Sequence, residues 1–175
     1  RIRDFPYYNN YLKLADFEYS VLVGCCNDLK KKAVFVGGGP LPMTAIIFAK
    51  NYGLNVSVID RDTEAVERSE KLLNSLNVEA EVIEASAETF MEYDSYDAVH
   101  IASMVGENRE EESEVFQNIN SQLGEQTHII GRTVHGNRKL LYRPVSDSVK
   151  KMFNVEAEKK PSKDIVNSTT VMTLH

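Results

Sequence analysis

Cysteine and long apolar runs are scarce in this chain. Its two cysteines, Cys25 and Cys26, are adjacent, which is a poor arrangement for a structural disulfide, and no Cys-x-x-Cys spacing occurs. No run of about 18 apolar residues is present, so the sequence predicts no membrane-spanning helix and no membrane partner. These absences favour reduced thiols in an intracellular, cytoplasmic protein.

Basic charge and metal-ligand spacing are also lacking. The net charge of −6 and the pI of about 5.3 argue against a nucleic-acid partner, which would require a basic surface. The four histidines (His100, His128, His135 and His175) show no ligand spacing, so we expect no bound metal. His100 and His128 fall in expected strands and are interpreted as hydrogen-bonded core groups. No Gly-x-Ser-x-Gly motif points to a hydrolase.

What the chain has is the pattern of an α/β protein. Its 175 residues, 42% hydrophobic and 26% charged, are typical of one globular domain. After residue 32, buried apolar runs alternate with helical patterns, which predicts a parallel sheet with helices on both faces. Expected strands cover about 33–36, 55–60, 79–84, 97–103 and 127–133, with two antiparallel edge strands at 155–158 and 166–174. Expected helices cover 5–28, 41–52, a segment from Thr63, 109–122 and 146–153.

A glycine-rich turn follows the first expected strand. Gly37, Gly38 and Gly39 precede two prolines, Pro40 and Pro42, whose φ values suit the first turn of a helix. Twenty-one residues after Gly39, the next strand ends in Asp60, where an acidic side chain can accept hydrogen bonds from ribose hydroxyls. These features indicate a nucleoside-binding domain.

The spacing of the glycines bears on which nucleoside is bound. A dinucleotide fingerprint needs glycine at the first, third and sixth positions, but the sixth position counted from Gly37 is Pro42. Each proline also removes an N–H donor from a turn that would hold phosphates. The pattern therefore favours a phosphate-free ligand such as S-adenosyl-L-methionine over a dinucleotide.

Four motifs lie in order along the chain. They are F-P-Y-Y-N-N-Y-L at 5–12, V-G-G-G-P-L-P-M-T at 36–44, R-T-V-H-G-N-R at 132–138 and L-Y-R-P-V at 141–145. With the A-S-M-V-G segment at 102–106, they resemble the nicotianamine synthase family over nearly the whole chain from Phe5. Family members carry a helical N-terminal domain, so residues 1–32 are interpreted as the end of such a domain and 33–175 as the catalytic domain.

The resemblance implies a Rossmann-like fold of the class I methyltransferase type and an unusual reaction. The family moves the 3-amino-3-carboxypropyl (aminobutanoyl) limb of S-adenosylmethionine to an amine, such as an amino acid or an aminobutanoyl unit. 5′-Methylthioadenosine is released, and the product is a nicotianamine-like metal chelator. Two alternatives stay open, a small-molecule methyltransferase and a non-catalytic S-adenosylmethionine-binding module. The sequence does not fix the oligomeric state.

The expected cofactor site follows from the strand ends. The donor would contact the strand-one loop, the end of strand two, the loop after strand three, which lines the adenine, and the exit of strand four beneath the methionine limb. These residues are Gly37, Gly38, Gly39, Pro40, Asp60, Arg61, Ser86, Ala87, Ala102 and Ser103.

The expected reactive centre is less specific. By its match to the family motif, Tyr8 is assigned to handling the reacting amine, with Tyr7 as a substrate contact; the other interpretation is that both cap the sheet as aromatic core. Arg132 and His135 follow strand five and are assigned to carboxylate binding and proton transfer.

Two further substrate contacts are expected. Arg138 would bind a carboxylate, or else be a surface charge. Glu107 would hold an acceptor ammonium, or else be part of a solvated helix start.

Overall fold

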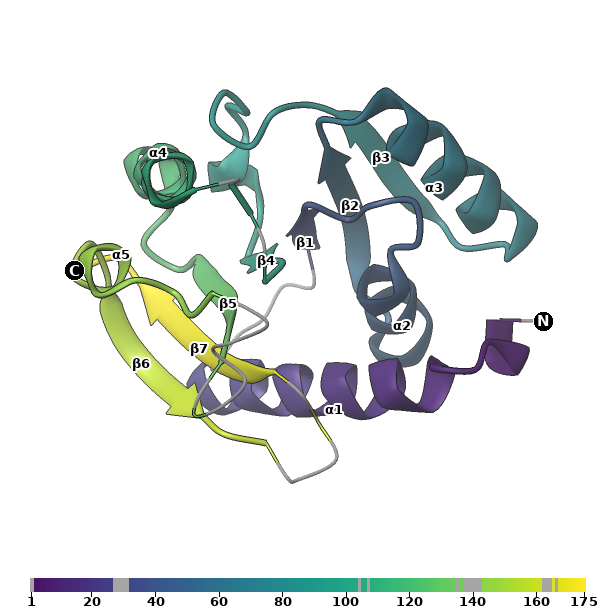
Figure 1. Ribbon diagram of the computed structural model, residues 1–175, viewed down its shortest axis with the longest axis horizontal. Coiled ribbons are helices and arrows are strands. Elements are labelled where there is room, and N and C mark those ends of the chain that lie inside the picture. The colour runs from purple at the N-terminus through teal and green to yellow at the C-terminus, as the bar shows by residue number, and fades with distance from the viewer. Residues whose placement is uncertain are drawn as a thin grey trace.

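A seven-stranded sheet runs through the molecule in the order β3-β2-β1-β4-β5-β7-β6 (Figure 1). The computed structural model describes residues 2–26, 32–103, 105–106, 108–134, 136, 143–161, 165 and 167–175. Strands β1 to β5 pair in parallel, and β7 is antiparallel to both β5 and β6. This arrangement confirms the predicted α/β class and its antiparallel C-terminal edge.

The elements have the following bounds. The strands are β1 (Lys32–Val36), β2 (Asn55–Asp60), β3 (Ala80–Glu84), β4 (Ala98–Ile101), β5 (His128–Thr133), β6 (Asn154–Lys159) and β7 (Ser168–Thr173). The α-helices are α1 (Tyr8–Cys25), α2 (Met43–Tyr52), α3 (Thr63–Ser75), α4 (Arg109–Gln122) and α5 (Asp147–Lys150), with short 3-10 turns η1 (Ile2–Asp4) and η2 (Tyr93–Ser95).

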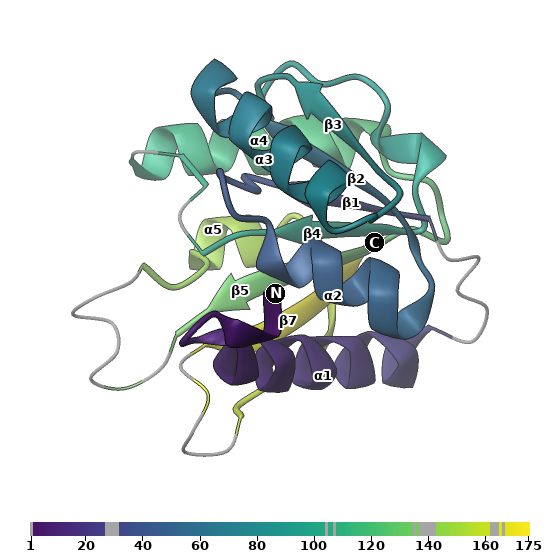
Figure 2. The same ribbon diagram turned by 90° about the vertical axis from the view of Figure 1, so that its right-hand side faces the viewer.

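Helices cover both faces of the sheet (Figures 1 and 2). Side chains of a strand point alternately to its two faces, and all the β1 residues after Lys32 are buried. Ala33 and Phe35 pack in the cluster that holds α1 and α2, whereas Val34 and Val36 pack in the cluster that holds α4 and α5. Because both faces are covered, the central strands read as continuous apolar runs.

The order of the strands creates a crevice at the carboxyl ends of the central strands. β1 lies between β2 and β4, so successive crossovers leave it in opposite directions. In open α/β sheets, ligands bind outside the carboxyl ends of the strands at such a switch point. The ends of β1, β2 and β4 therefore place the residues after Val36, Ile59 and Ile101 around a common space.

Several predicted boundaries hold and others shift. The predicted strand 55–60 and helix 109–122 are confirmed, and Gly53 ends α2 in a left-handed conformation (φ 65). The first helix is shorter than expected, Tyr8–Cys25. β4 ends at Ile101, before Ser103.

The prediction that Pro40 and Pro42 form the first turn of a helix was wrong. Helix α2 begins at Met43, and Pro42 precedes it with ψ 60, which is not helical. Pro40 and Pro42 thus shape the approach to the helix and do not form its first turn.

Candidate functional site

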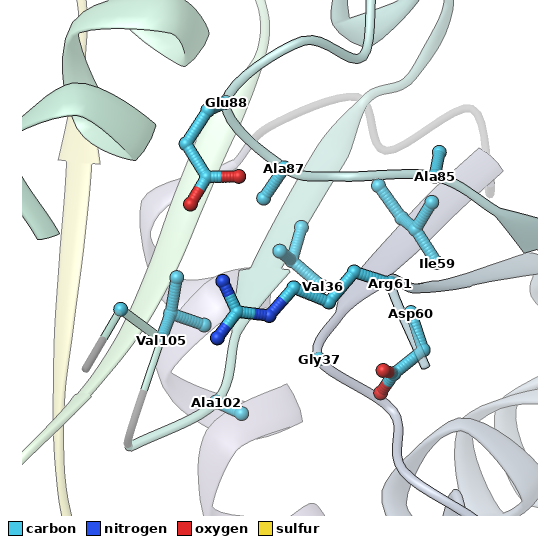
Figure 3. Close-up of a pocket in the computed structure, with 11 residues that line it drawn as sticks. Val36, Gly37, Ile59, Asp60, Arg61, Ala85, Ala87, Glu88, Ala102 and Val105 are labelled. Carbon is cyan, nitrogen blue, oxygen red and sulfur yellow. The ribbon is translucent and has the colours of Figure 1, made fainter. Parts of the chain in front are cut away.

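A cavity of about 280 Å³ opens at the carboxyl ends of β1, β2 and β4 (Figure 3). We call it the first cavity. Its walls include Gly37 after β1, Asp60 and Arg61 after β2, and Ala87 and Ala102 from the loops after β3 and β4. The crevice expected from the topology is therefore a real hollow in the protein surface.

The glycine turn packs tightly against β2. Gly37 and Gly39 have φ of 72 and 63, in the left-handed region that favours glycine. The N–H groups of Gly37 and Gly38 both donate to the Ile59 carbonyl, at 2.9 and 3.3 Å. A Cβ on Gly38 would lie 2.2 Å from Val58 Cγ1, so no larger residue fits without a shift. The turn needs glycine for its conformation and for its closeness to β2.

Asp60 is held in place by backbone donors. Its Oδ2 accepts the Gly39 N–H at 2.7 Å, and its Oδ1 accepts the Asp62 N–H at 3.1 Å. A carboxylate has further lone pairs on both oxygens, so these two bonds leave acceptor capacity toward the first cavity. The fixed carboxylate can accept hydrogen bonds from neighbouring hydroxyl groups of a ligand.

Charged side chains flank the far side of the first cavity. Figure 3 shows Arg61 extending across the cavity toward Val105, with Glu88 on the opposite wall. Arg61 Nη1 lies 3.8 Å from Glu111 Oε2. The Ser86 hydroxyl donates to the Glu88 carboxylate, so Ser86 contacts a wall residue and is not part of the lining.

A second cavity of about 190 Å³ lies on the other side of the glycine turn. It shares Val36, Gly37 and Ala102 with the first cavity. Its remaining walls are mostly apolar, but four polar side chains line it. These are Tyr11, Thr44, His100 and Arg132.

Behind this wall lies a buried glutamate. Arg132 donates through Nε to Glu18 Oε1 at 2.6 Å and through Nη2 to Glu18 Oε2 at 2.9 Å. His100 Nε2 lies 3.0 Å from Glu18 Oε2, and Arg132 Nη2 also donates to Thr44 Oγ1 at 2.6 Å. The Glu18 side chain has 0% exposure, against 3% for His100 and 12% for Arg132. Helices α1 and α2 are thereby joined to β4 and β5.

The charges of this cluster follow from its contacts. Burial favours the neutral form of Glu18, but the charges of Arg132 and His100 and their hydrogen bonds outweigh it and hold the pKa of Glu18 at about 2. Burial lowers the pKa of His100 despite the nearby Glu18 carboxylate. The pKa of Arg132 is raised, because Glu18 outweighs the effect of burial. Near neutral pH the cluster therefore holds one anion, one cation and a neutral imidazole.

Seven of the predicted site residues line one of the two cavities. They are Gly37, Asp60, Arg61, Ala87 and Ala102 in the first cavity, with Gly37, Ala102, Gly38 and Arg132 in the second. Six others line neither cavity. They are Gly39, Pro40, Ser86, Ser103, Tyr7 and Tyr8.

The six take other positions. Gly39 holds Asp60, Pro40 is exposed, and Ser103 accepts a hydrogen bond from Asn167 Nδ2 at 2.5 Å. Tyr7, the predicted substrate contact, is 63% exposed and packs on Phe5.

Tyr8 packs beside Met43 and Ile46, so the tyrosine of this helix that reaches the second cavity is Tyr11. The predictions for Glu107, His135 and Arg138 lie outside the described residues.

Sequence reasoning missed Glu18, Tyr11 and Thr44, and read His100 as a core group only. His100 is indeed buried and hydrogen-bonded, but it also lines the second cavity. Glu18 lies on the same helix face as Ala15 and Leu22, both fully buried. A lone charge inside an apolar stripe is the signal that could have revealed it.

Comparison with known proteins decides the family. The family model described as "Nicotianamine synthase protein" matches residues 1–174. The chain belongs to the nicotianamine synthase family. It is 31% identical to nicotianamine synthase 2 of Arabidopsis thaliana over 176 residues, covering 95% of this chain and 54% of that protein. It is 32% identical to nicotianamine synthase 2 of Oryza sativa subsp. japonica, covering 95% and 54%. The chain thus spans about half the length of these family members.

Solved structures agree with this assignment. Superposition on a crystal structure of the nicotianamine synthase MtNAS in complex with MTA and tNA gives a TM-score of 0.86 at 30% identity, covering 99% of this chain and 63% of that chain. A glutamate-to-glutamine mutant of MtNAS in complex with S-adenosylmethionine gives the same TM-score at 31% identity, covering 99% and 65%. More distant matches show the fold alone, including magnesium protoporphyrin IX methyltransferase at 12% identity and TM-score 0.70, covering 95% and 80%.

Two features are absent from the described residues. No helix among them is both long and apolar enough to cross a membrane. Within the same part of the chain, no group of three or more His, Cys, Asp or Glu side chains could hold a metal ion.

Proposed function

We propose that this chain carries out the chemistry of its family: it binds S-adenosylmethionine and transfers the 3-amino-3-carboxypropyl limb to an amine acceptor. The observation that supports this proposal most strongly is the pair of cavities on either side of one glycine turn, with Val36, Gly37 and Ala102 in both. A ligand whose sulfur lies at the shared wall can extend its nucleoside into one cavity and its amino-acid limb into the other.

The proposed step balances as a simple displacement. The lone pair of a neutral acceptor amine attacks the limb carbon that is bonded to sulfur, and a C–N bond forms. The C–S bond breaks, and its electron pair stays on sulfur, which becomes the neutral thioether of 5′-methylthioadenosine. The new ammonium then gives up one proton to a base or to water. Which of the carbons on sulfur reacts is decided by the one that faces the nucleophile.

The residues of the first cavity are assigned to the nucleoside. Asp60 accepts hydrogen bonds from the ribose hydroxyls, because Gly39 and Asp62 already fix its carboxylate. Gly37 lets the backbone approach the ligand closely, since its φ of 72 demands a residue without Cβ. Ala87, on the loop after β3, lines the face available to the adenine ring.

The second cavity is assigned to the amino-acid limb. Arg132 is the cation on its wall, and a guanidinium pairs well with a carboxylate. The Tyr11 and Thr44 hydroxyls supply further hydrogen-bonding groups on the same wall. Tyr8 and Tyr7 remain proposals that rest on the family motif, and Glu107, His135 and Arg138 remain proposals that rest on their places after expected strands four and five.

Product analysis tests this function. The chain is incubated with S-adenosylmethionine carrying ¹³C in the limb, and the products are read by mass spectrometry. We expect one 5′-methylthioadenosine for each labelled aminobutanoyl unit that is transferred. S-Adenosylhomocysteine would instead identify a methyltransferase. Binding of S-adenosylmethionine without any product would identify a non-catalytic module.

A further inference from the structure

The buried carboxylate of Glu18 is the most unusual group outside the two cavities. It lies in the apolar face of α1, has no exposure, and carries a charge at neutral pH. A carboxylate fully removed from water is costly unless its hydrogen bonds compensate for the lost hydration. Among the described residues, the hydrogen bonds of the Glu18 carboxylate go to two side chains that line the second cavity, Arg132 and His100.

These contacts restrict the orientation of Arg132. Its Nε and Nη2 bond to both carboxylate oxygens in a bidentate pair, and Nη2 also donates to Thr44 Oγ1. Because the guanidinium is planar, the bidentate pair on its Nε–Nη2 edge, together with the second bond from Nη2, fixes the plane and so the direction of Nη1. Nη1 makes no hydrogen bond to any residue within the described ranges.

The same carboxylate restricts the protonation of His100. An ionised carboxylate only accepts hydrogen bonds, so the Nε2 that lies 3.0 Å from Glu18 Oε2 must carry a proton. In a neutral imidazole the Nδ1 then has the lone pair and is an acceptor. Stacking on Phe35, with the ring centroids 4.8 Å apart, keeps the ring from turning.

The cluster is therefore neutral as a whole and polar at its surface. Glu18 offsets the charge of Arg132, and His100 adds none. Such a wall suits a zwitterion better than a bare anion, because a bare anion would lack a full counter-charge. The limb of S-adenosylmethionine, which bears one ammonium and one carboxylate, has this character.

We propose that Glu18 is a positioning residue for the second cavity: it orients the Arg132 guanidinium, selects the Nε2-protonated form of His100, and thereby makes this wall specific for a zwitterionic amino-acid group. This inference rests on the proposed function, because it takes the ligand limb to be that of S-adenosylmethionine. Glu18 acts through its two partners and does not itself line the cavity.

Binding measurements with two ligands test the proposal. S-Adenosylmethionine carries the limb, whereas 5′-methylthioadenosine lacks it, keeps only the methyl and adenosyl groups on a neutral sulfur, and serves as the probe of the first cavity. Kd values for both are measured by calorimetry with the native chain, Glu18→Gln and Glu18→Asp. We expect each variant to raise the Kd for S-adenosylmethionine about tenfold and to change the Kd for 5′-methylthioadenosine less than about twofold.

Each outcome decides something. If neither ligand binds the native chain, the proposed function fails before this inference is reached. If both ligands bind and the variants weaken neither, or weaken both equally, Glu18 is a structural group only and the inference is overturned. Glu18→Asp keeps the negative charge but shifts the carboxylate relative to Arg132 and His100, so it tests alignment and not charge. Circular dichroism checks that each variant is folded.

Nuclear magnetic resonance measures the tautomer of His100, which would stay the same in the variants if Glu18 had only a structural role. The ¹⁵N shifts of the His100 ring, assigned by their loss in His100→Gln, should show a protonated Nε2 and an unprotonated Nδ1 in the native chain at neutral pH. In Glu18→Gln we expect this pattern to give way to a mixture of tautomers, because an amide can donate as well as accept. The opposite tautomer in the native chain would contradict the assignment.

The matched control is Glu112→Gln. Glu112 is also a buried carboxylate, 8% exposed, paired with Arg109 Nη1 at 2.6 Å on its own helix. It lines neither of the two cavities. We expect this variant to bind both ligands as the native chain does.

Discussion

The two cavities of this protein share one glycine turn but are built in different ways. The first cavity is shaped by backbone conformation and short contacts: a tight turn, a carboxylate held by two N–H groups, and small side chains. The second cavity depends on charges brought together from distant parts of the chain, with Glu18 and Arg132 114 residues apart in sequence. A nucleoside end needs fit and closeness, whereas an amino-acid end needs aligned charge.

The largest expected effect is the loss of protein stability when the charge cluster behind the second cavity is broken. Glu18→Ala leaves the largely buried Arg132 side chain, 12% exposed, without its counter-charge, and we expect the free energy of unfolding to fall by about 3–5 kcal/mol. Urea denaturation measures this loss. Glu112→Ala is the control, because Arg109 is 46% exposed and can be hydrated; we expect a loss of about 1 kcal/mol. Equal losses would show that the Glu18 cluster contributes no more to stability than the Glu112–Arg109 pair does.

The pH dependence of stability should come from the same cluster. The pKa of Glu18 is about 2 in the folded chain, below its ordinary value of 4.5, so its contribution is complete above about pH 4.5. It is lost as the pH falls toward 2, when the carboxylate takes up a proton. The shift corresponds to about 3 kcal/mol.

Thermal unfolding at stepped pH compares the native chain with Glu18→Gln. The native chain should lose more stability than the variant between about pH 4.5 and pH 2. Parallel curves would mean that Glu18 does not titrate as described.

A smaller effect is expected at the glycine turn. In Gly38→Ala the new Cβ must displace Val58 Cγ1, which it would otherwise approach to 2.2 Å, at a cost of about 1–3 kcal/mol. Binding of both nucleoside ligands should weaken, because the turn forms the wall shared by the two cavities. Gly24→Ala, in exposed helix with no atom within 4 Å, should instead stabilise by up to about 1 kcal/mol. Differential scanning calorimetry and ligand titration check both variants.

The smallest effect concerns the rim of the first cavity. Asp60→Asn replaces a charged acceptor with a neutral one, and we expect both S-adenosylmethionine and 5′-methylthioadenosine to bind about tenfold more weakly. Asp62→Asn is the control, since asparagine caps the start of α3 as well as aspartate does. A loss for S-adenosylmethionine alone would place Asp60 at the limb and contradict the division of the ligand.

The sequence predicted the first cavity well because its determinants are local. A triple glycine follows one buried strand and an aspartate ends the next. Because these strands are parallel neighbours, the two features lie side by side at the carboxyl ends. The strand 55–60 and the helix 109–122 were equally readable, since the first is a short buried run and the second has an apolar stripe of helical period.

The second cavity could not be predicted in the same way. Glu18 bonds to residues 82 and 114 positions away, and no local pattern states which buried charge will find which partner. The tyrosine motif in residues 7–11 predicted a helix but not its rotation: Tyr11 lines the second cavity, whereas Tyr7 is exposed. Helix rotation depends on packing against the sheet, which only the assembled core determines.

The division of one ligand between two cavities is tested most directly by a crystal structure of this chain with S-adenosylmethionine. We expect the ribose hydroxyls on Asp60 in the first cavity and the limb carboxylate on Arg132 in the second, with Arg132 still paired to Glu18. A limb that leaves the second cavity empty and points to solvent, with Arg132 untouched, would contradict the account.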